Sequence, residues 1–242
     1  MKKIQSSFIG LFLLATFGSA QAQSLLADDE LLLTEVLFEE SEPGIQPYVT
    51  RVLLGQHFMR LDDGLDQDPQ GYILFDRKTH EVHHFNHQQQ SHLLMKALQH
   101  EKIDFEIDYR VVKRSLPDAP QIDGKAAVRH EFIAGETLCR KSINVAGFLV
   151  DVTQALTDYE QALAAQMSQT LGDIPASVRS ACFLSNYYLY AGDYLKGGFP
   201  MTLSDDQGRH KILLSFRQVV KPASLLNKVD GYKLYYANRS NL

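Results

Sequence analysis

The feature that most constrains the fold is a long series of short strand-like segments, which occupies the chain up to residue 145. Residues 48–54 show the pattern well, because β-branched and apolar side chains alternate there with a period of two. Residues 71–75 and 80–85 predict a hairpin, since turn-tolerant residues lie between them. Short strands joined by short turns are typical of an antiparallel meander. The other predicted strands of this series are residues 31–39, 57–61, 91–95, 105–112, 126–133 and 137–145.

The hydrophobic period then changes to that of a helix. Apolar residues between 151 and 171 fall on one helical face, and Asp151 and Gly172 are placed to begin and end this helix. A second helix is predicted from Pro175 through Cys182 towards Tyr187, because proline is favoured in a first helical turn. The apolar face of the first helix consists of Val152, Ala155, Leu156, Tyr159, Leu163, Met167 and Leu171, and the strand pattern returns at 199–203, 210–219 and 231–236.

This order of elements predicts an α+β fold that is mainly β. An antiparallel sheet with one apolar face must cover that face, either by closing or by packing helices onto it. The helix at 151–171 is the expected cover, since its polar face lacks the lysines and arginines of membrane-surface helices. We therefore expect a curved antiparallel sheet, a half-open barrel, with a helical lid over a concave apolar interior.

The first 22 residues have the pattern of an export signal. Lys2 and Lys3 precede an apolar run at 8–17, and Ala20-Gln21-Ala22 has the small residues that signal peptidase requires. An apolar run of about ten residues is too short to span a bilayer, which needs about twenty. We expect a signal peptide at 1–22, cleaved near Ala22, and a single periplasmic domain at 23–242. An uncleaved membrane tether is the alternative.

The charge balance and the cysteines agree with export. The chain has 24 basic and 29 acidic residues and a net charge of -5, so nucleic acid and anionic membranes are poor partners. Cys139 and Cys182 are the two cysteines, and an exported location favours a disulfide between them. Closing a loop of about 44 residues would stabilise the fold by about 4 kcal/mol. Two free buried thiols, or one catalytic thiol, are the alternatives.

Three short segments resemble a known family. The sequence Ile-Leu-Phe-Asp-Arg-Lys-Thr at 73–79, followed by Phe85-Asn86, is similar to a strand, turn and aromatic strand of the LolA/LolB periplasmic lipoprotein carriers. Residues 58–63 resemble the carrier strand that ends the early meander, and Asp230-Gly231-Tyr232 resembles an ending of related domains. The resemblance implies a LolA-like domain that carries an apolar group, in outer-membrane lipoprotein or envelope trafficking.

The function predicted from these observations is binding, not catalysis. The sequence has no nucleophile elbow, P-loop, zinc-protease or dinucleotide motif, and we expect no cofactor and no metal site. The expected partners are an apolar ligand such as a lipid, a lipidated protein, or another envelope protein, without stable membrane insertion. A scaffold protein with a filled cavity is the alternative, and a hydrolase is a third hypothesis. Strand alternation selects as ligand-lining residues Met59, Leu61, Ile73, Phe75 and Val82.

Two polar clusters invite a metal interpretation. Five histidines lie between residues 80 and 92, but residues four apart on a strand are about 13 Å apart and cannot bind one zinc ion together. We expect solvated strand histidines there, with surface metal binding or a functional metal or pH-sensing site as alternatives. An acidic run between residues 62 and 68 does not match a calcium-binding loop and predicts a solvated turn. The clusters are His80, His83, His84, His87 and His92, and Asp62, Asp63, Asp66 and Asp68.

Overall fold

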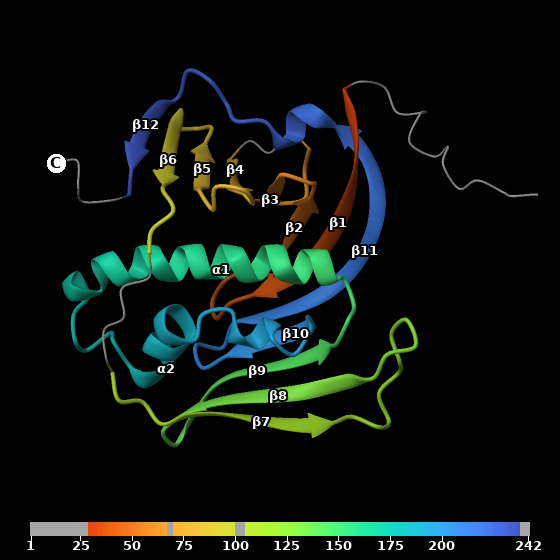
Figure 1. Cartoon of the computed structure of the whole chain (residues 1–242), viewed down its shortest axis with the longest axis vertical. Coiled ribbons are helices and arrows are strands. Elements are labelled where there is room, and N and C mark those ends of the chain that lie inside the picture. The colour runs from red at the N-terminus through yellow and green to blue at the C-terminus, as the bar shows by residue number, and fades with distance from the viewer. Residues whose placement is uncertain (1–28, 67–69, 100–104, 238–242) are drawn as a thin grey trace, which may run out of the picture.

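The computed structural model describes residues 29–66, 70–99 and 105–237, which form a mainly β protein built on a single twelve-stranded sheet (Figure 1). The order of strands across the sheet is β12-β6-β5-β4-β3-β2-β1-β11-β10-β9-β8-β7. The predicted signal peptide at 1–22 lies outside the described residues. The strands are β1 (Glu30–Ser41), β2 (Tyr48–Leu54), β3 (Phe58–Asp62), β4 (Gly71–Asp76), β5 (Val82–Asn86), β6 (Ser91–Met95), β7 (Tyr109–Ser115), β8 (Ala127–Ala134), β9 (Thr137–Val145), β10 (Phe199–Asp205), β11 (His210–Pro222) and β12 (Lys233–Tyr236).

Two antiparallel meanders make up the sheet, and the long strands β1 and β11 join them. Strands β1 to β6 are neighbours in chain order, as are β7 to β11, and β1 pairs with β11 along its whole length. Among the described strands only β12 and β6 pair in parallel, so the predicted antiparallel sheet is confirmed except at this edge. The strands β12 and β7 are the two edges, and the described sheet does not close into a barrel.

The sheet bends where the two meanders meet. A register shift lies between Leu37 and Phe38 in the pairing of β1 with β11, and such a bulge bends a strand and increases its twist. Strand β10 pairs with β11 only over Thr202–Ser204, after which β11 continues alone beside β1. Figure 1 shows the long curve that β11 makes on the outside of the molecule.

The first predicted helix is present as α1 (Val150–Thr170), which lies across one face of the sheet (Figure 1). Its side chains Val152, Ala155 and Leu156 are buried in a core with strand residues of both meanders. The predicted cap is wrong, because Leu149 occupies the N-cap position in a left-handed conformation and no side chain caps the helix. The end also differs, since Gly172 lies in a 3-10 turn, η1 (Leu171–Asp173), that extends α1.

The second predicted helix is largely wrong. Only α2 (Ala181–Leu184) is α-helical, and it continues as a π-helical turn, η2 (Ser185–Leu189). The helix begins late because Ser180, in an extended conformation, accepts a hydrogen bond from the backbone N–H of Phe183 at 3.1 Å and acts as the N-cap. The predicted disulfide is confirmed: Cys139 of β9 is bonded to Cys182 of α2, which ties this helix to the sheet.

One predicted strand is displaced along the chain. The sequence predicts a strand at residues 105–112, but the strand in the structure, β7, is Tyr109–Ser115. It pairs with Val128–Ala134 of β8. The apolar side chains of Phe105 and Ile107 instead pack with Leu171, Leu184 and Tyr188 beneath the helical segment. Burial of these two side chains in a second small core outweighs their strand-like pattern.

The two faces of the first meander have different cores. On the face towards α1, Val52, Leu54 and Phe75 are buried with the helix. The alternate residues of the same strands point to the opposite face, where Leu53 and Leu74 pack against the 3-10 turn η4 (Ala223–Leu226). Both faces of these strands therefore carry buried side chains, as the alternation of β side chains allows. Within the part of the chain that the structure describes, no helix is long and apolar enough to span a membrane.

Candidate functional site

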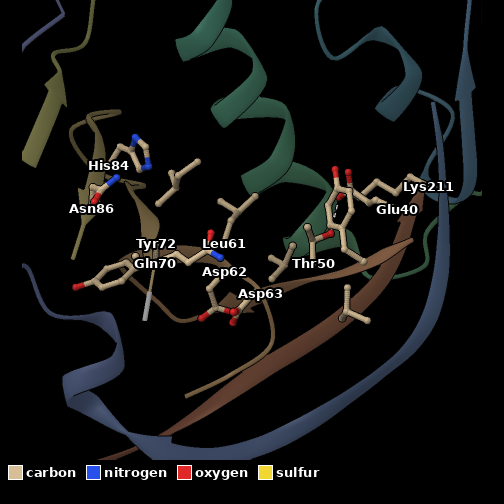
Figure 2. Close-up of a pocket in the computed structure, with 15 residues that line it drawn as sticks. Glu40, Thr50, Leu61, Asp62, Asp63, Gln70, Tyr72, His84, Asn86 and Lys211 are labelled. Atoms are coloured by element: carbon tan, nitrogen blue, oxygen red, sulfur yellow. Dashed lines mark hydrogen bonds and ion pairs between the residues drawn. The ribbon is translucent and has the colours of Figure 1, made fainter. Parts of the chain in front are cut away.

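An open trough of about 550 Å³ lies on the face of the sheet that carries α1, over strands β2 to β5 (Figure 2). Its floor is apolar and is made by alternate residues of three adjacent strands, Val52, Leu61 and Ile73. Leu61 and Ile73 are direct partners in the pairing of β3 with β4, so their side chains lie next to each other. The polar residues along its rim include Glu40, Thr50, Asp63, His84, Asn86 and Lys211.

The five residues selected from strand alternation share this face but fall into two groups. Leu61 and Ile73 are half-buried and line the trough. Met59, Phe75 and Val82 are fully buried in the core under α1. The helix makes the division, because its Tyr159 packs edge-on against Phe75 with ring centroids 5.8 Å apart.

An ion pair forms one end of the trough. The ammonium of Lys211 lies 2.7 Å from the carboxylate of Glu40, which also accepts a hydrogen bond from the hydroxyl of Thr50 at 2.5 Å. Burial opposes ionisation of Glu40, but the charge and hydrogen bond of Lys211 outweigh it and lower the pKa of the carboxyl group. Glu40 and Lys211 also line a second, smaller pocket, so this ion pair stands between the two spaces.

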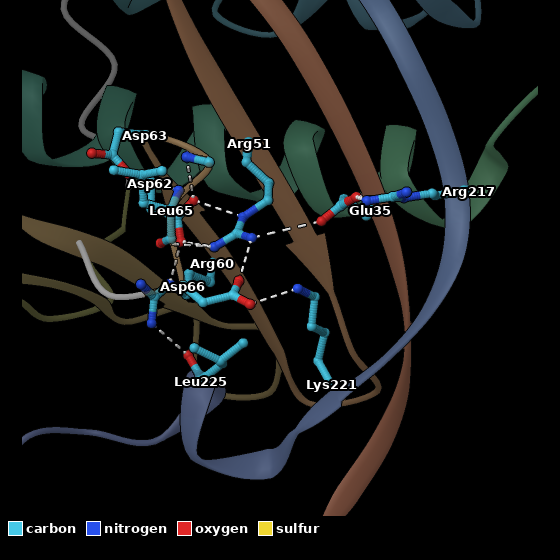
Figure 3. Close-up of polar contacts among 11 residues, drawn as sticks. Glu35, Arg51, Arg60, Asp62, Asp63, Leu65, Asp66, Arg217, Lys221 and Leu225 are labelled. Carbon is cyan, nitrogen blue, oxygen red and sulfur yellow. Dashed lines mark hydrogen bonds and ion pairs between the residues drawn. The ribbon is translucent and has the colours of Figure 1, made fainter.

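The opposite face of the same strands carries a buried charge network (Figure 3). Arg51 donates two hydrogen bonds to the carboxylate of Asp62, each at 2.8 Å, and a third to Asp66 at 2.6 Å. Arg60 donates to Asp62 at 2.6 Å and to the carbonyl oxygen of Leu225 at 3.0 Å. The network joins strands β2 and β3, the loop after β3 and the turn η4.

Two further pairs extend this network to the molecular surface. Glu35, whose carboxylate lies 3.6 Å from the guanidinium of Arg51, accepts a hydrogen bond from Arg217 of β11 at 2.7 Å. Lys221 donates to Asp66 at 2.6 Å. Burial opposes the charge of Arg51, but its hydrogen bonds to Asp62 and Asp66 dominate and raise the pKa of the guanidinium. The hydrogen bond from Lys221 lowers the pKa of Asp66.

The prediction of a solvated acidic turn is therefore wrong for Asp62, whose side chain is fully buried. Asp66 is half-exposed but has two cationic partners, and Asp68 lies outside the described residues. The mismatch of this run to a calcium-binding loop predicts a solvated turn, but it carries no information about the partners that strand pairing supplies. Strand pairing places Arg51 opposite Asp62. The sequence feature that could have indicated a buried charge is Arg51 itself, which lies between Val49 and Leu53 on the same face of β2.

The histidines are divided between the two faces of the sheet. His84 lies on the trough, whereas His83 is buried on the opposite face with its Nδ1 2.9 Å from Nε2 of His92. His87 Nδ1 lies 2.7 Å from the hydroxyl of Tyr232. The expectation of solvated strand histidines is therefore wrong for His83. Among the described residues, no group of three or more histidine, cysteine or carboxylate side chains is arranged to hold a metal ion.

Comparisons with known proteins name no family for the chain. No family model matches the sequence, and no curated protein matches it. Among solved structures, two crystal forms of PNGF-II are similar at 9% sequence identity. The C2 form has a TM-score of 0.43 over 86% of this chain and 31% of that one, and the P21 form has a TM-score of 0.39 over 85% and 31%. The chain thus spans about a third of PNGF-II, and the resemblance to the LolA/LolB carriers stays a prediction.

Proposed function

We propose that this protein is a periplasmic binding protein that shelters a lipid, an acyl chain or another apolar group in the trough over β2 to β5. The observation that supports the proposal is the apolar floor formed by Val52, Leu61 and Ile73. A volume of about 550 Å³ is within the range of about 300–1,000 Å³ of small-molecule sites. Burying an acyl chain there gains about 0.8 kcal/mol for each methylene group removed from water.

In this proposal the bent sheet acts as a half-open barrel and α1 acts as its lid. Movement of the helix away from the sheet would uncover Met59, Phe75 and Val82, which continue the floor of the trough on the same strands. A longer apolar ligand would then contact all five residues that strand alternation selects. Release would need the helix to return, or a partner protein that accepts the ligand.

The proposed location follows from the N-terminal segment and the cysteines. Residues 1–22 have the charge, apolar run and small residues of a signal peptide. The disulfide between Cys139 and Cys182 agrees with an oxidising compartment such as the periplasm. A role in outer-membrane lipoprotein or envelope trafficking, without a catalytic step or a cofactor, is part of the same proposal.

A scaffold or interaction protein of the envelope is the second candidate. The observation in its favour is that the space between α1 and the sheet is filled by the protein's own side chains. Phe38 and Phe199 stack with ring centroids 5.9 Å apart, and both are buried with Val152 of the helix. In this alternative the trough stays without a ligand, and partner proteins bind the outer surface.

Binding of a fluorescent fatty acid to the purified full chain, together with mass spectrometry of its lipid extract, tests the proposal. We expect saturable binding, and an affinity at least tenfold lower for the double variant Leu61→Gln/Ile73→Gln, because both substitutions place amides on the apolar floor. Leu214→Gln is the control, since Leu214 is 51% exposed and lies on β11 away from the trough. No binding of the fatty acid by the unmodified protein, or equal binding by the double variant, would contradict the proposal. A periplasmic crosslink to a partner protein, with no lipid in the extract, would support the scaffold alternative.

A further inference from the structure

The smaller pocket beyond the Glu40–Lys211 ion pair contains a buried cation that has no anionic partner among the residues that the structure describes. This pocket has a volume of about 220 Å³ and lies where β9, β10 and β11 meet α1 and the turns η2 and η3 (Asp193–Leu195). Its charged lining comes from elements far apart in the sequence. The residues that matter here are Arg140, Glu160, Tyr194, Arg209 and Lys211.

Arg140 is the unusual member of this lining. Arg140 is only 7% exposed, and its Nε atom is buried without a hydrogen-bond partner among the described residues. Within the described part of the chain, its guanidinium makes no ion pair, and it lies over the ring of Tyr194, whose centroid is 4.8 Å away. A cation over an aromatic ring is attracted to it, but the ring does not satisfy the N–H donors of the guanidinium.

The other charges of the pocket are already committed to partners. Arg209 donates to Asp205 at 2.7 Å, and Lys211 pairs with Glu40 at 2.7 Å. The carboxylate of Glu160 accepts a hydrogen bond from the hydroxyl of Tyr194 at 2.8 Å. Among the described residues, no carboxylate lies within ion-pair distance of Arg140, although removing a cation from water is costly unless an anion compensates it.

We propose that this pocket binds a small oxyanion, a carboxylate or a phosphate group, with Arg140 as its main ligand. The planar guanidinium presents parallel N–H donors that match two oxygens of either group. Arg209 and Lys211 line the same space, but so do their partners Asp205 and Glu40, which offset their charges, so Arg140 supplies the attraction for an anion. Since one water molecule takes about 30 Å³, the pocket has room for a group of several atoms in place of solvent. The inference does not depend on a ligand in the trough.

Glu160 sets a limit on the charge that the pocket tolerates. Its carboxylate lines the same space as Arg140 and repels an incoming anion. Replacing Glu160 with glutamine removes this repulsion and keeps an acceptor for the Tyr194 hydroxyl. Affinity for an oxyanion therefore falls when Arg140 is neutralised and rises when Glu160 is neutralised, a pair of opposite effects that a purely structural role of these residues would not produce.

The test is a titration of the full, disulfide-bonded chain with sodium phosphate and, separately, with sodium acetate, followed by NMR chemical shifts at constant ionic strength set with sodium chloride. We expect chemical-shift changes that saturate with at least one of the two anions. The anion that gives the saturating change shows whether the pocket prefers a phosphate or a carboxylate. Arg140→Gln should weaken that binding at least tenfold. Arg114→Gln is the matched control, because Arg114 has a 62% exposed side chain on the edge strand β7.

Several outcomes would overturn the inference. Equal chemical-shift changes in a titration with sodium chloride would show a general salt effect. Equal affinity of Arg140→Gln and the unmodified protein for the anion would show that Arg140 does not bind it. If Arg140→Gln does not fold, as circular dichroism would reveal, Glu160→Gln still decides the question. This variant should bind the anion about threefold or more tightly than the unmodified protein, and unchanged or weaker binding contradicts the site.

Discussion

The two faces of the first meander are built from the same strands but are stabilised by different interactions. Towards α1, the strands β2 to β5 bury apolar side chains such as Met59 and Phe75 against the helix. On the opposite face they bury Arg51, Arg60 and Asp62 beside a smaller apolar core. The first face depends on removal of apolar surface from water, which has no directional requirement. The second depends on each buried charge having a partner at hydrogen-bond distance.

This difference decides which residues each face can lose. A deletion on the helix face leaves a cavity whose cost depends on how well its surroundings relax. On the charged face, the cost depends on whether the deletion leaves an uncompensated ion. The pair of Lys221 with Asp66 adds little, since exposed ion pairs contribute about 0–1 kcal/mol. In the pair of Arg217 with Glu35, only Arg217 is exposed, and the Glu35 carboxylate is buried. The fully buried pairs of Asp62 therefore dominate this face.

The largest effect is expected for removal of the central carboxylate. Asp62→Ala leaves the guanidinium groups of Arg51 and Arg60 without their main buried partner. The free energy of unfolding should fall by about 3–5 kcal/mol, the usual cost of breaking a buried ion pair. Urea unfolding followed by circular dichroism measures it.

Asp66→Ala is the matched control for this prediction. The same substitution is made in the loop that follows β3, where the side chain of Asp66 is 46% exposed, so the expected loss is about 1 kcal/mol or less. Equal losses in the two variants would mean that the buried pairs are not what stabilises the charged face.

The next effect concerns the helix face and separates its two groups of residues. Met59→Ala should lower the free energy of unfolding by about 2–5 kcal/mol, because Met59 is fully buried in the core. Leu61→Ala, on the half-buried floor of the trough, should cost less in the absence of a ligand. Urea unfolding of the lipid-free protein compares them. A larger loss for Leu61→Ala would contradict the division of this face by α1.

The last effect is the pH dependence of the buried histidine pair, which is small for each pH unit and accumulates over the acidic range. Burial first, and then the charges of Lys228 and His92, lower the pKa of His83 to about 4. The unfolded chain binds a proton at this imidazole below about pH 6.5, whereas the folded protein does so only near pH 4. The free energy of unfolding should therefore fall as the pH is lowered from 6.5 to 4, by up to about 1.4 kcal/mol per pH unit from His83.

Urea unfolding at several pH values, compared between the unmodified protein and His83→Phe, isolates this contribution from that of the carboxylates. Burial also lowers the pKa of His92, so its contribution has the same sign. The two proteins should differ in slope between pH 4 and 6.5 and run parallel above it. Identical slopes across this window would show that His83 is not held neutral by the fold.

Much of the local structure could be predicted from the sequence. The strands β2, β6 and β9 lie at residues 48–54, 91–95 and 137–145, as the alternation predicts, and α1 differs from its predicted range by one residue at each end. Side-chain periods of two and 3.6 are local properties of the backbone. The disulfide was predictable as well, since only two cysteines exist in the chain. Local rules failed at the second helix, where Ser180 caps a later start.

The sequence by itself determined the series of strands, the amphipathic helix and the pair of cysteines, because each depends on residues close together along the chain. The tertiary structure alone decided that β1 pairs with β11, that Arg51 lies opposite Asp62, and that His83 is buried beside His92. It also placed Arg140 in a charged pocket without an anionic partner among the described residues. These features depend on strand pairing and burial between distant segments, and a charged side chain has no partner in the sequence until the sheet has placed one beside it.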